Sequence, residues 1–453
     1  MVFCSGVLLC GKALRTPGVL LVPVKWAVAL FSIKLIFIPA ILVLNGPFHA
    51  TLPALPTAAN MNYALLLDSL AFLGFSVAVS RSTQTVQTPA PVSPRGLRSM
   101  GGYRWEIVAA FIFAIIGIIG ILGTFTSIEQ AEAYASTPNM DVVSWEKSSK
   151  TLLQAASSML RPFLPMSFIL LLARSMLLRQ RFQTIMWGLL SAGVTVLVFA
   201  TYNYNRTVLA IPLAALLVML VGRSRVPLWL SWSVLGAAAC LFLTWGALRQ
   251  TGRGLATWTA DDTLQVALQS MGSPLDTLQV YANGPQFGGY VIESVSQDHL
   301  YWGQTLVASM MYPVPILGGA FRPYSGVMIY NTAIYGYGGK TILDQVIPVS
   351  AELYINFNVF GVFVGFYALG VLAAGLQRRY VSAIHPVERY CWIQLSLYIL
   401  LAITASIAVV SQMLLYMCLP YFAVLAILYK TKQHVIVYRW RSVRTTIVCL
   451  KHS

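Results

Sequence analysis

Charged side chains are scarce in this chain of 453 residues, since only 10% are Asp, Glu, Lys or Arg. Soluble globular domains carry about 25% charged residues, so this composition excludes an ordinary soluble enzyme and a disordered chain. Hydrophobic residues make up 57% of the chain instead. They gather in runs of roughly 20, about the length needed to cross a bilayer core. The sequence therefore predicts a polytopic membrane protein.

Cysteine and histidine are also scarce, with six and five residues. Every cysteine is expected in a span or on the inner side, and no CxxC pattern occurs, so no disulfide framework or metal knuckle is predicted. His49 and His299 are the only histidines expected on the outer side, which argues against an all-protein metal site. We therefore expect neither a metal ion nor a cofactor.

Basic residues alternate between the links that join the hydrophobic runs. One set of links holds most of the 30 Lys and Arg, and the other holds most of the 14 Asp and Glu. Cytoplasmic loops retain Lys and Arg, so both termini are expected inside the cell and the acidic loops outside. The net charge of +16 is then a topology signal, and nucleic acid is not an expected partner. The predicted spans are 22–44, 61–80, 106–125, 159–178, 184–202, 207–222, 227–247, 352–376, 391–410 and 413–429.

This plan describes a single all-α membrane domain over residues 1–453, with a basic cytoplasmic tail at 430–453. One outer loop, 248–351, is far longer than the other links, and long loops of this kind are usually functional or disordered. Its many aromatic residues exclude a disordered composition. Segments 264–271 and 305–311 are predicted as short helices. The aromatic residues could anchor the loop at the bilayer surface or bind sugar rings.

Several arginines are expected on the outer face, where the retention rule disfavours them. Arg249, Arg253 and Arg322 lie in the long loop, and Arg206 lies at the turn between spans five and six. A single arginine at a span end usually reaches to lipid headgroups. Several on one face indicate a phosphate site, because the guanidinium group binds phosphate with two parallel hydrogen bonds.

Two ionisable residues fall at membrane depth. Asp68 lies in the second predicted span and Arg161 in the fourth. Such residues are candidates for function by default. An internal structural pairing of each is an equally good interpretation.

The segment from Pro348 to Gly361, PVSAELYINFNVFG, leads from the long loop into the eighth span. It resembles the segment of bacterial oligosaccharide repeat-unit polymerases, the O-antigen polymerase family, where the large periplasmic loop re-enters the membrane. Asn205-Arg206 ahead of an apolar span and Arg322-Pro323 after Tyr312-Pro313 also fit. The match departs at Asn358, where the family pattern has glycine.

The resemblance implies an inner-membrane glycosyltransferase with a GT-C-like fold of about ten transmembrane helices. It would polymerise polyprenyl-pyrophosphate-linked repeat units on the outer face, without nucleotide or metal. A flippase and a chain-length regulator would be its partners.

The resemblance also suggests roles for individual residues. Arg249, Arg253 and Arg322 would neutralise the leaving pyrophosphate. Glu352 would be the base for the attacking hydroxyl, although it could instead cap a helix N-terminus. The expected substrate-binding residues are Arg206, Tyr324, Tyr354 and Asp344. Asp344 is also the second candidate for the general base, after Glu352.

Three other classes of membrane protein share some of these features: a glycan ligase, a metal-dependent transferase and a transporter. A ligase that transfers finished glycan to an acceptor would share the architecture and the donor. A metal-dependent transferase normally has acidic residues in its first outer loop, but Asn45 to Asn60 contains none. A transporter tends to have repeated halves, and no repeat is evident. The polymerase is the favoured interpretation.

The topology can be tested with a reporter that is active only in the cytoplasm. Fusions after Arg98, Arg181, Arg225 or Arg379 should be active, because these basic links are expected inside. Fusions within 254–346 should be silent. Activity from the long loop would place the proposed active face on the wrong side of the membrane.

Overall fold

The computed structural model describes residues 2–10, 23–48, 52–83, 104–124, 152–178, 180–200, 206–221, 274–295, 300–315, 317–336, 346–383 and 385–430. Within these ranges all regular structure is helical. Six helices are long and apolar enough to cross a membrane, as expected for an α-helical membrane protein. They are Pro23–Asn45, Ala58–Ser82, Trp105–Thr124, Ala156–Leu177, Arg181–Val198 and Val349–Ser382.

These six helices coincide with predicted spans one to five and eight. The sixth predicted span coincides with α13 (Arg206–Val221), whose apolar part, Ala210–Leu220, is shorter than the others. The seventh, 227–247, lies outside the described residues. The total of ten spans therefore stays a prediction.

The ninth predicted span, 391–410, is wrong as a continuous helix. Helix α22 (Pro386–Leu400) ends inside it, a single 3-10 turn follows, and α23 (Ile407–Met417) begins at a new cap. Ser406 supplies that cap, because its hydroxyl accepts a hydrogen bond from the Val409 N–H. Helix α23 and the next helix, Leu419–Lys430, are bent by 59° at their junction. The tenth predicted span, 413–429, crosses this junction, so it is also wrong as a single straight helix. Hydropathy alone revealed neither interruption.

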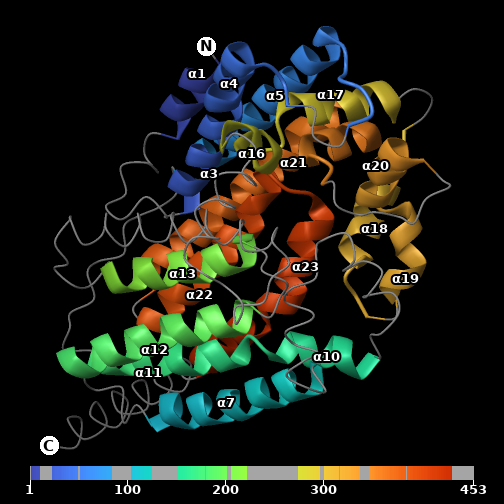
Figure 1. The fold of residues 1–453 in the computed structure, drawn as a ribbon. Helices are drawn as coiled ribbons and strands as arrows, with labels where there is room; N and C mark the ends of the chain where they lie inside the picture. Colours follow the sequence, from blue (N-terminus) through green and yellow to red (C-terminus); the bar gives the residue numbers. More distant parts are fainter. Residues whose placement is uncertain are drawn as a thin grey trace, which may run out of the picture.

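The central pair of helices is α5 (Ala58–Thr83) and α21 (Val349–Ser382). Glycine lets their backbones approach closely. A side chain at Gly74 would meet the Phe363 carbonyl, and one at Gly370 would meet the Phe75 carbonyl. Helices α1 (Val2–Leu9), α3 (Pro23–Ser32) and α4 (Ile38–Asn45) lie near this pair, in blue in Figure 1.

A second group of helices occupies the lower part of Figure 1. It contains α7 (Arg104–Thr124), α10 (Leu152–Leu160), α11 (Phe163–Leu177) and α12 (Arg181–Ala200). Helices α11, α13 and α22 contribute buried side chains to one shared hydrophobic core. Arg161 is buried in the turn between α10 and α11, where its backbone lies against Gly120 of α7.

The described part of the long loop folds into short helices. These are α16 (Pro274–Tyr281), α17 (Pro285–Ser294), α18 (Gln304–Met311), α19 (Leu317–Phe321) and α20 (Gly326–Tyr335). Figure 1 shows α18, α19 and α20 stacked beside α23. Helix α18 confirms the helix predicted at 305–311, whereas 264–271 lies outside the described residues.

Glu293 attaches α17 to the start of α5. Its carboxylate accepts hydrogen bonds from the Thr57 backbone N–H at 3.0 Å and from the Asn60 side chain at 2.9 Å. These two bonds favour the charged form, so the pKa of Glu293 lies below its usual value. The carboxylate also lies at the N-terminus of α5, where negative charge is favourable.

Helix α21 is interrupted near its start. Phe357 and Asn358 have non-helical backbone angles, so the short segment Val349–Asn356 is separated from the long span that follows. Asn358 has φ +57° and ψ −159°, a conformation that is almost restricted to glycine. The Asn358 side chain accepts a hydrogen bond from the Val359 N–H at 2.7 Å. The position where the family pattern has glycine is thus the position where the backbone favours glycine.

Asn358 substitutions should reveal this strain. Asn358→Gly should keep or raise the thermal unfolding midpoint of the detergent-solubilised protein, because glycine adopts the angle freely. Asn358→Val should lower the free energy of unfolding by about 1–3 kcal/mol. Equal midpoints for the two variants would mean that the break is not strained.

Candidate functional site

The predicted site residues fall into two sets. Arg249, Arg253 and Asp344 lie outside the described residues, and Arg206 begins α13 with its side chain not described. The structure describes the other four. Arg322 and Tyr324 form the 3-10 turn η3 (Arg322–Tyr324), and Glu352 and Tyr354 lie in the short segment Val349–Asn356 of α21.

Glu352 is completely buried against the loop helices. One of its carboxylate oxygens accepts a hydrogen bond from the Ser309 hydroxyl of α18 at 2.7 Å. The same hydroxyl accepts a bond from the Gly326 N–H at 3.3 Å, and a side chain at Gly326 would collide with the carboxylate. The other oxygen, Oε2, is buried with no side-chain partner. The Ile407 backbone N–H is a further hydrogen-bond donor to the carboxylate.

Helix α23 completes the surroundings of Glu352. Ser411 of α23 donates a hydrogen bond to the Ser309 carbonyl at 2.8 Å, so α18 is held between α21 and α23. Ile407 is the first residue of α23, so the Glu352 carboxylate lies at the N-terminus of a neighbouring helix. The role of Glu352 as catalytic base stays a prediction, since the carboxylate is enclosed behind α18.

Asn356 fixes the other end of the short segment. Its side-chain oxygen accepts a bond from the Gly303 N–H at 2.8 Å, and its amide donates to Thr305 and to the Glu352 carbonyl. The Tyr301 N–H donates to the Ile355 carbonyl at 3.0 Å. The turn before α18 is therefore attached to the point at which α21 breaks.

Arg322 lies at the surface of the loop helices. Its guanidinium group stacks on the Tyr312 ring, 4.9 Å from the ring centre. The Arg322 Nε atom is buried with no hydrogen-bond partner, although the residue as a whole is partly exposed. Gly326, four residues after Arg322, lies against the Glu352 carboxylate. The segment that carries Arg322 therefore also contacts Glu352. This arginine is available to an anion.

An open groove of about 530 Å³ is lined by Phe321 and Tyr324, which flank Arg322 and Pro323 in the chain. Tyr324 belongs to its lining, whereas Tyr354 packs edge-on against Tyr63 of α5, with ring centres 5.6 Å apart. Tyr354 therefore faces α5. The groove lining comprises Trp302, Gly303, Gln304, Val307, Ala308, Ala320, Phe321 and Tyr324.

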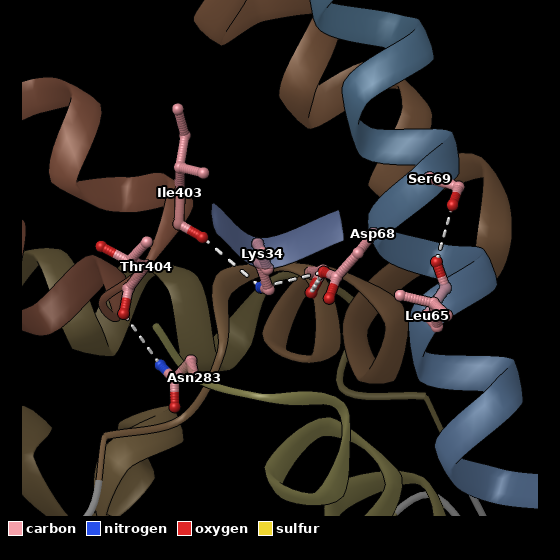
Figure 2. A network of polar contacts seen from close by, with 8 residues as sticks. Lys34, Leu65, Asp68, Ser69, Asn283, Ile403 and Thr404 are labelled. Carbon is pink, nitrogen blue, oxygen red and sulfur yellow. Dashed lines mark hydrogen bonds and ion pairs between the residues drawn. The ribbon is translucent and has the colours of Figure 1, made fainter. Parts of the chain in front are cut away.

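Asp68 forms a buried ion pair that the sequence did not identify. The Lys34 ammonium lies 2.9 Å from the Asp68 carboxylate, and their side chains are only 2% and 5% exposed. Ser350 of α21 donates to the same carboxylate at 2.6 Å, and Lys34 also donates to the Ile403 carbonyl at 3.4 Å. Figure 2 shows Lys34 between Asp68 and Ile403. The internal pairing considered for Asp68 is confirmed.

The short helix η1 (Ile33–Phe37), which carries Lys34, has π-helical hydrogen bonding. Such turns are rare and are frequent at functional sites. A lysine within the first predicted span was a signal in the sequence, but its partner could not be inferred. Ser350 is two residues before Glu352, so the ion pair fixes the start of the segment that carries Glu352.

A second polar cluster joins α7 to α22. The His385 Nε2 atom lies 2.8 Å from the buried Glu106 carboxylate, and its Nδ1 accepts a bond from the Val387 N–H. Nε2 is therefore the protonated nitrogen and donates to Glu106. Arg174 lies 3.9 Å from the other Glu106 oxygen. Because the charged groups of this cluster pair with one another, it serves to connect the helices.

Metal ligation finds no support in the described ranges. They contain no group of three or more His, Cys, Asp or Glu that could hold a metal ion. No protein-family model, curated protein or solved structure matches this chain. The buried Glu352 carboxylate, Arg322 and the groove are the candidate parts of a site in the described residues.

The buried ion pair gives a direct test of how the short segment is held. Asp68→Asn or Lys34→Met should each lower the free energy of unfolding by about 3–5 kcal/mol, because each leaves a charge or its partner unpaired. The double variant Lys34→Met/Asp68→Leu should recover most of that loss. The measurement is thermal unfolding in detergent, with exposed Arg81→Met as the control, which should change little. A double variant no more stable than the single ones would argue against the pairing.

Proposed function

We propose that this chain is a membrane-embedded glycosyltransferase that polymerises polyprenyl-pyrophosphate-linked oligosaccharide repeat units. The observation that carries the proposal is the position of the segment Pro348–Gly361, which resembles the polymerase family. Its polar residues Glu352 and Asn356 contact the loop helices, and those helices carry Arg322 and the groove at their surface. The family-like segment and the candidate anion site thus form one unit.

The reaction would proceed by displacement at a sugar carbon. A hydroxyl of the lipid-linked acceptor attacks the anomeric carbon of the donor, and the bond from that carbon to the pyrophosphate oxygen breaks. The pyrophosphate leaves with the bonding electron pair, and a nearby arginine stabilises its charge. Arg322 suits this role because its guanidinium is already oriented by the Tyr312 ring. The positive charge of Arg322 would stabilise the pyrophosphate directly.

Glu352 is proposed as the acceptor of the hydroxyl proton. The Oε2 atom, which has no side-chain partner, supports this role. The enclosure of the carboxylate behind Ser309 supports a positioning role instead, in which Glu352 holds α18 and the groove in place. The two roles differ in what a glutamine at this position would do, because glutamine can still accept a hydrogen bond but cannot take a proton at neutral pH.

Substitution of Arg322 and Glu352 separates these roles. Arg322→Lys should lose most activity while the protein still inserts, since lysine lacks the planar two-point geometry.

Glu352→Gln should lower the rate about 10²–10⁴-fold if Glu352 is the base. It should leave the rate nearly unchanged if Glu352 only holds α18. The assay is purified protein in vesicles with lipid-linked repeat units, scored as a ladder of polymer lengths.

Arg389→Lys is the matched control for Arg322→Lys, because Arg389 donates to the Ala383 carbonyl at the far end of α21. It should keep the normal ladder. Normal ladders from both Arg322→Lys and Glu352→Gln would exclude these residues from catalysis. A ligase would instead add preformed polymer to an acceptor without lengthening it, and a transporter would form no new glycosidic bond.

A further inference from the structure

The groove beside Arg322 has a mostly apolar lining. Trp302 is 76% exposed and Tyr324 is 54% exposed, and Val307, Ala320 and Phe321 extend the apolar surface between them. Polar side-chain groups in the lining are few: the Gln304 amide, the Tyr324 hydroxyl and the Trp302 indole N–H. A glycan needs many directed hydrogen bonds, whereas an apolar chain needs contact area and few polar groups. The lining therefore favours an apolar chain.

Helix α18 presents two different faces. Thr305, Ala308 and Ser309 are buried and follow the helical repeat that faces α21 and α23. Val307 and Met310 are 55% and 56% exposed. Soluble proteins rarely leave neighbouring large apolar residues exposed without a binding role. The outer face of α18 is thus suited to contact lipid.

The groove meets the start of the long part of α21 at Gly303. Gly303, which belongs to the groove lining, lies so close to the Phe357 ring that an added Cβ would be 3.1 Å from it. From that point Phe360, Val364 and Val371 form an exposed stripe at helical spacing, with exposures of 75%, 44% and 41%. Since Val349–Ser382 is apolar and long enough to cross a membrane, this stripe is expected to face lipid tails.

We infer that this groove holds the isoprenoid chain of a polyprenyl phosphate lipid, which enters sideways along the α21 stripe. The inference rests on the proposed function and names which part of its substrate binds here. Phe321 and Tyr324 of the lining flank Arg322 in the chain, so a chain in the groove would bring its phosphate end near a guanidinium group that forms no ion pair within the described residues. The aromatic rings of Trp302, Phe321 and Tyr324 pack against the branched, unsaturated chain.

Photolabelling with a lipid that carries no sugar tests the groove without the transfer reaction. The probe is undecaprenyl phosphate with a diazirine in the isoprene units nearest the phosphate, in phosphatidylethanolamine–phosphatidylglycerol vesicles that contain the full chain. We expect label in peptides of α18, α19 and η3. Excess unlabelled undecaprenyl phosphate should remove it, and excess dioleoyl phosphatidylglycerol should not.

Tryptophan substitutions at two exposed alanines form a matched pair. Ala320→Trp fills the groove from an exposed position of α19, and labelling should fall about tenfold. Ala40→Trp adds the same side chain at an exposed position of α4, away from the groove lining, and should label normally. Both substitutions are at exposed sites, so both proteins should fold.

Three results would overturn the inference. One is label spread equally over α7, whose exposed residues Phe111, Ile119 and Leu122 also suit lipid contact. Another is equal displacement by the diacyl lipid, and the third is displacement by the soluble repeat-unit oligosaccharide, which would make the groove a sugar site. Groove labelling in a protein that forms no polymer would refute the proposed function alone. Polymer formation without groove labelling would refute the groove alone.

Discussion

The short segment Val349–Asn356 must satisfy its polar side chains inside the protein, and much of the arrangement follows from this constraint. Ser350 bonds to Asp68 of α5, Glu352 to Ser309 of α18, and Asn356 to the turn at Gly303. In an apolar setting each unsatisfied polar group costs several kcal/mol. Because the partners come from three different parts of the chain, satisfying them brings the N-terminal helices, the loop helices and α21 together.

The break after this segment divides α21 into two parts with different contacts. The long part that follows Asn358 packs against α5 through close backbone contacts at Gly74 and Gly370. The short part changes direction and can present polar groups to the loop helices without interrupting the apolar span. Backbone strain of this kind persists only where the surrounding contacts hold it in place. Here the bonds at Asn356 and at Asn358 provide that support.

Helix α18 connects the buried and exposed sides of the candidate site. Its inner face is bound to Glu352 and, through the Ser309 carbonyl, to Ser411 of α23. Its outer face lines the groove next to Arg322. A change at the buried carboxylate can therefore shift the groove through one rigid element. The enclosed Glu352 is thus linked through α18 to the groove at the surface.

The sequence by itself determined the membrane-protein class, because a span needs only a local run of apolar residues, and six of the ten predicted runs are helices of sufficient length. It also marked Glu352, Arg322 and Tyr324 through local motifs. It did not reveal that Lys34 pairs with Asp68, that the helix at 391–410 is interrupted, or that Tyr354 faces α5. Those features depend on contacts between residues far apart in the chain. Only tertiary packing decides which buried polar groups meet, since each needs a partner but the sequence does not specify which one.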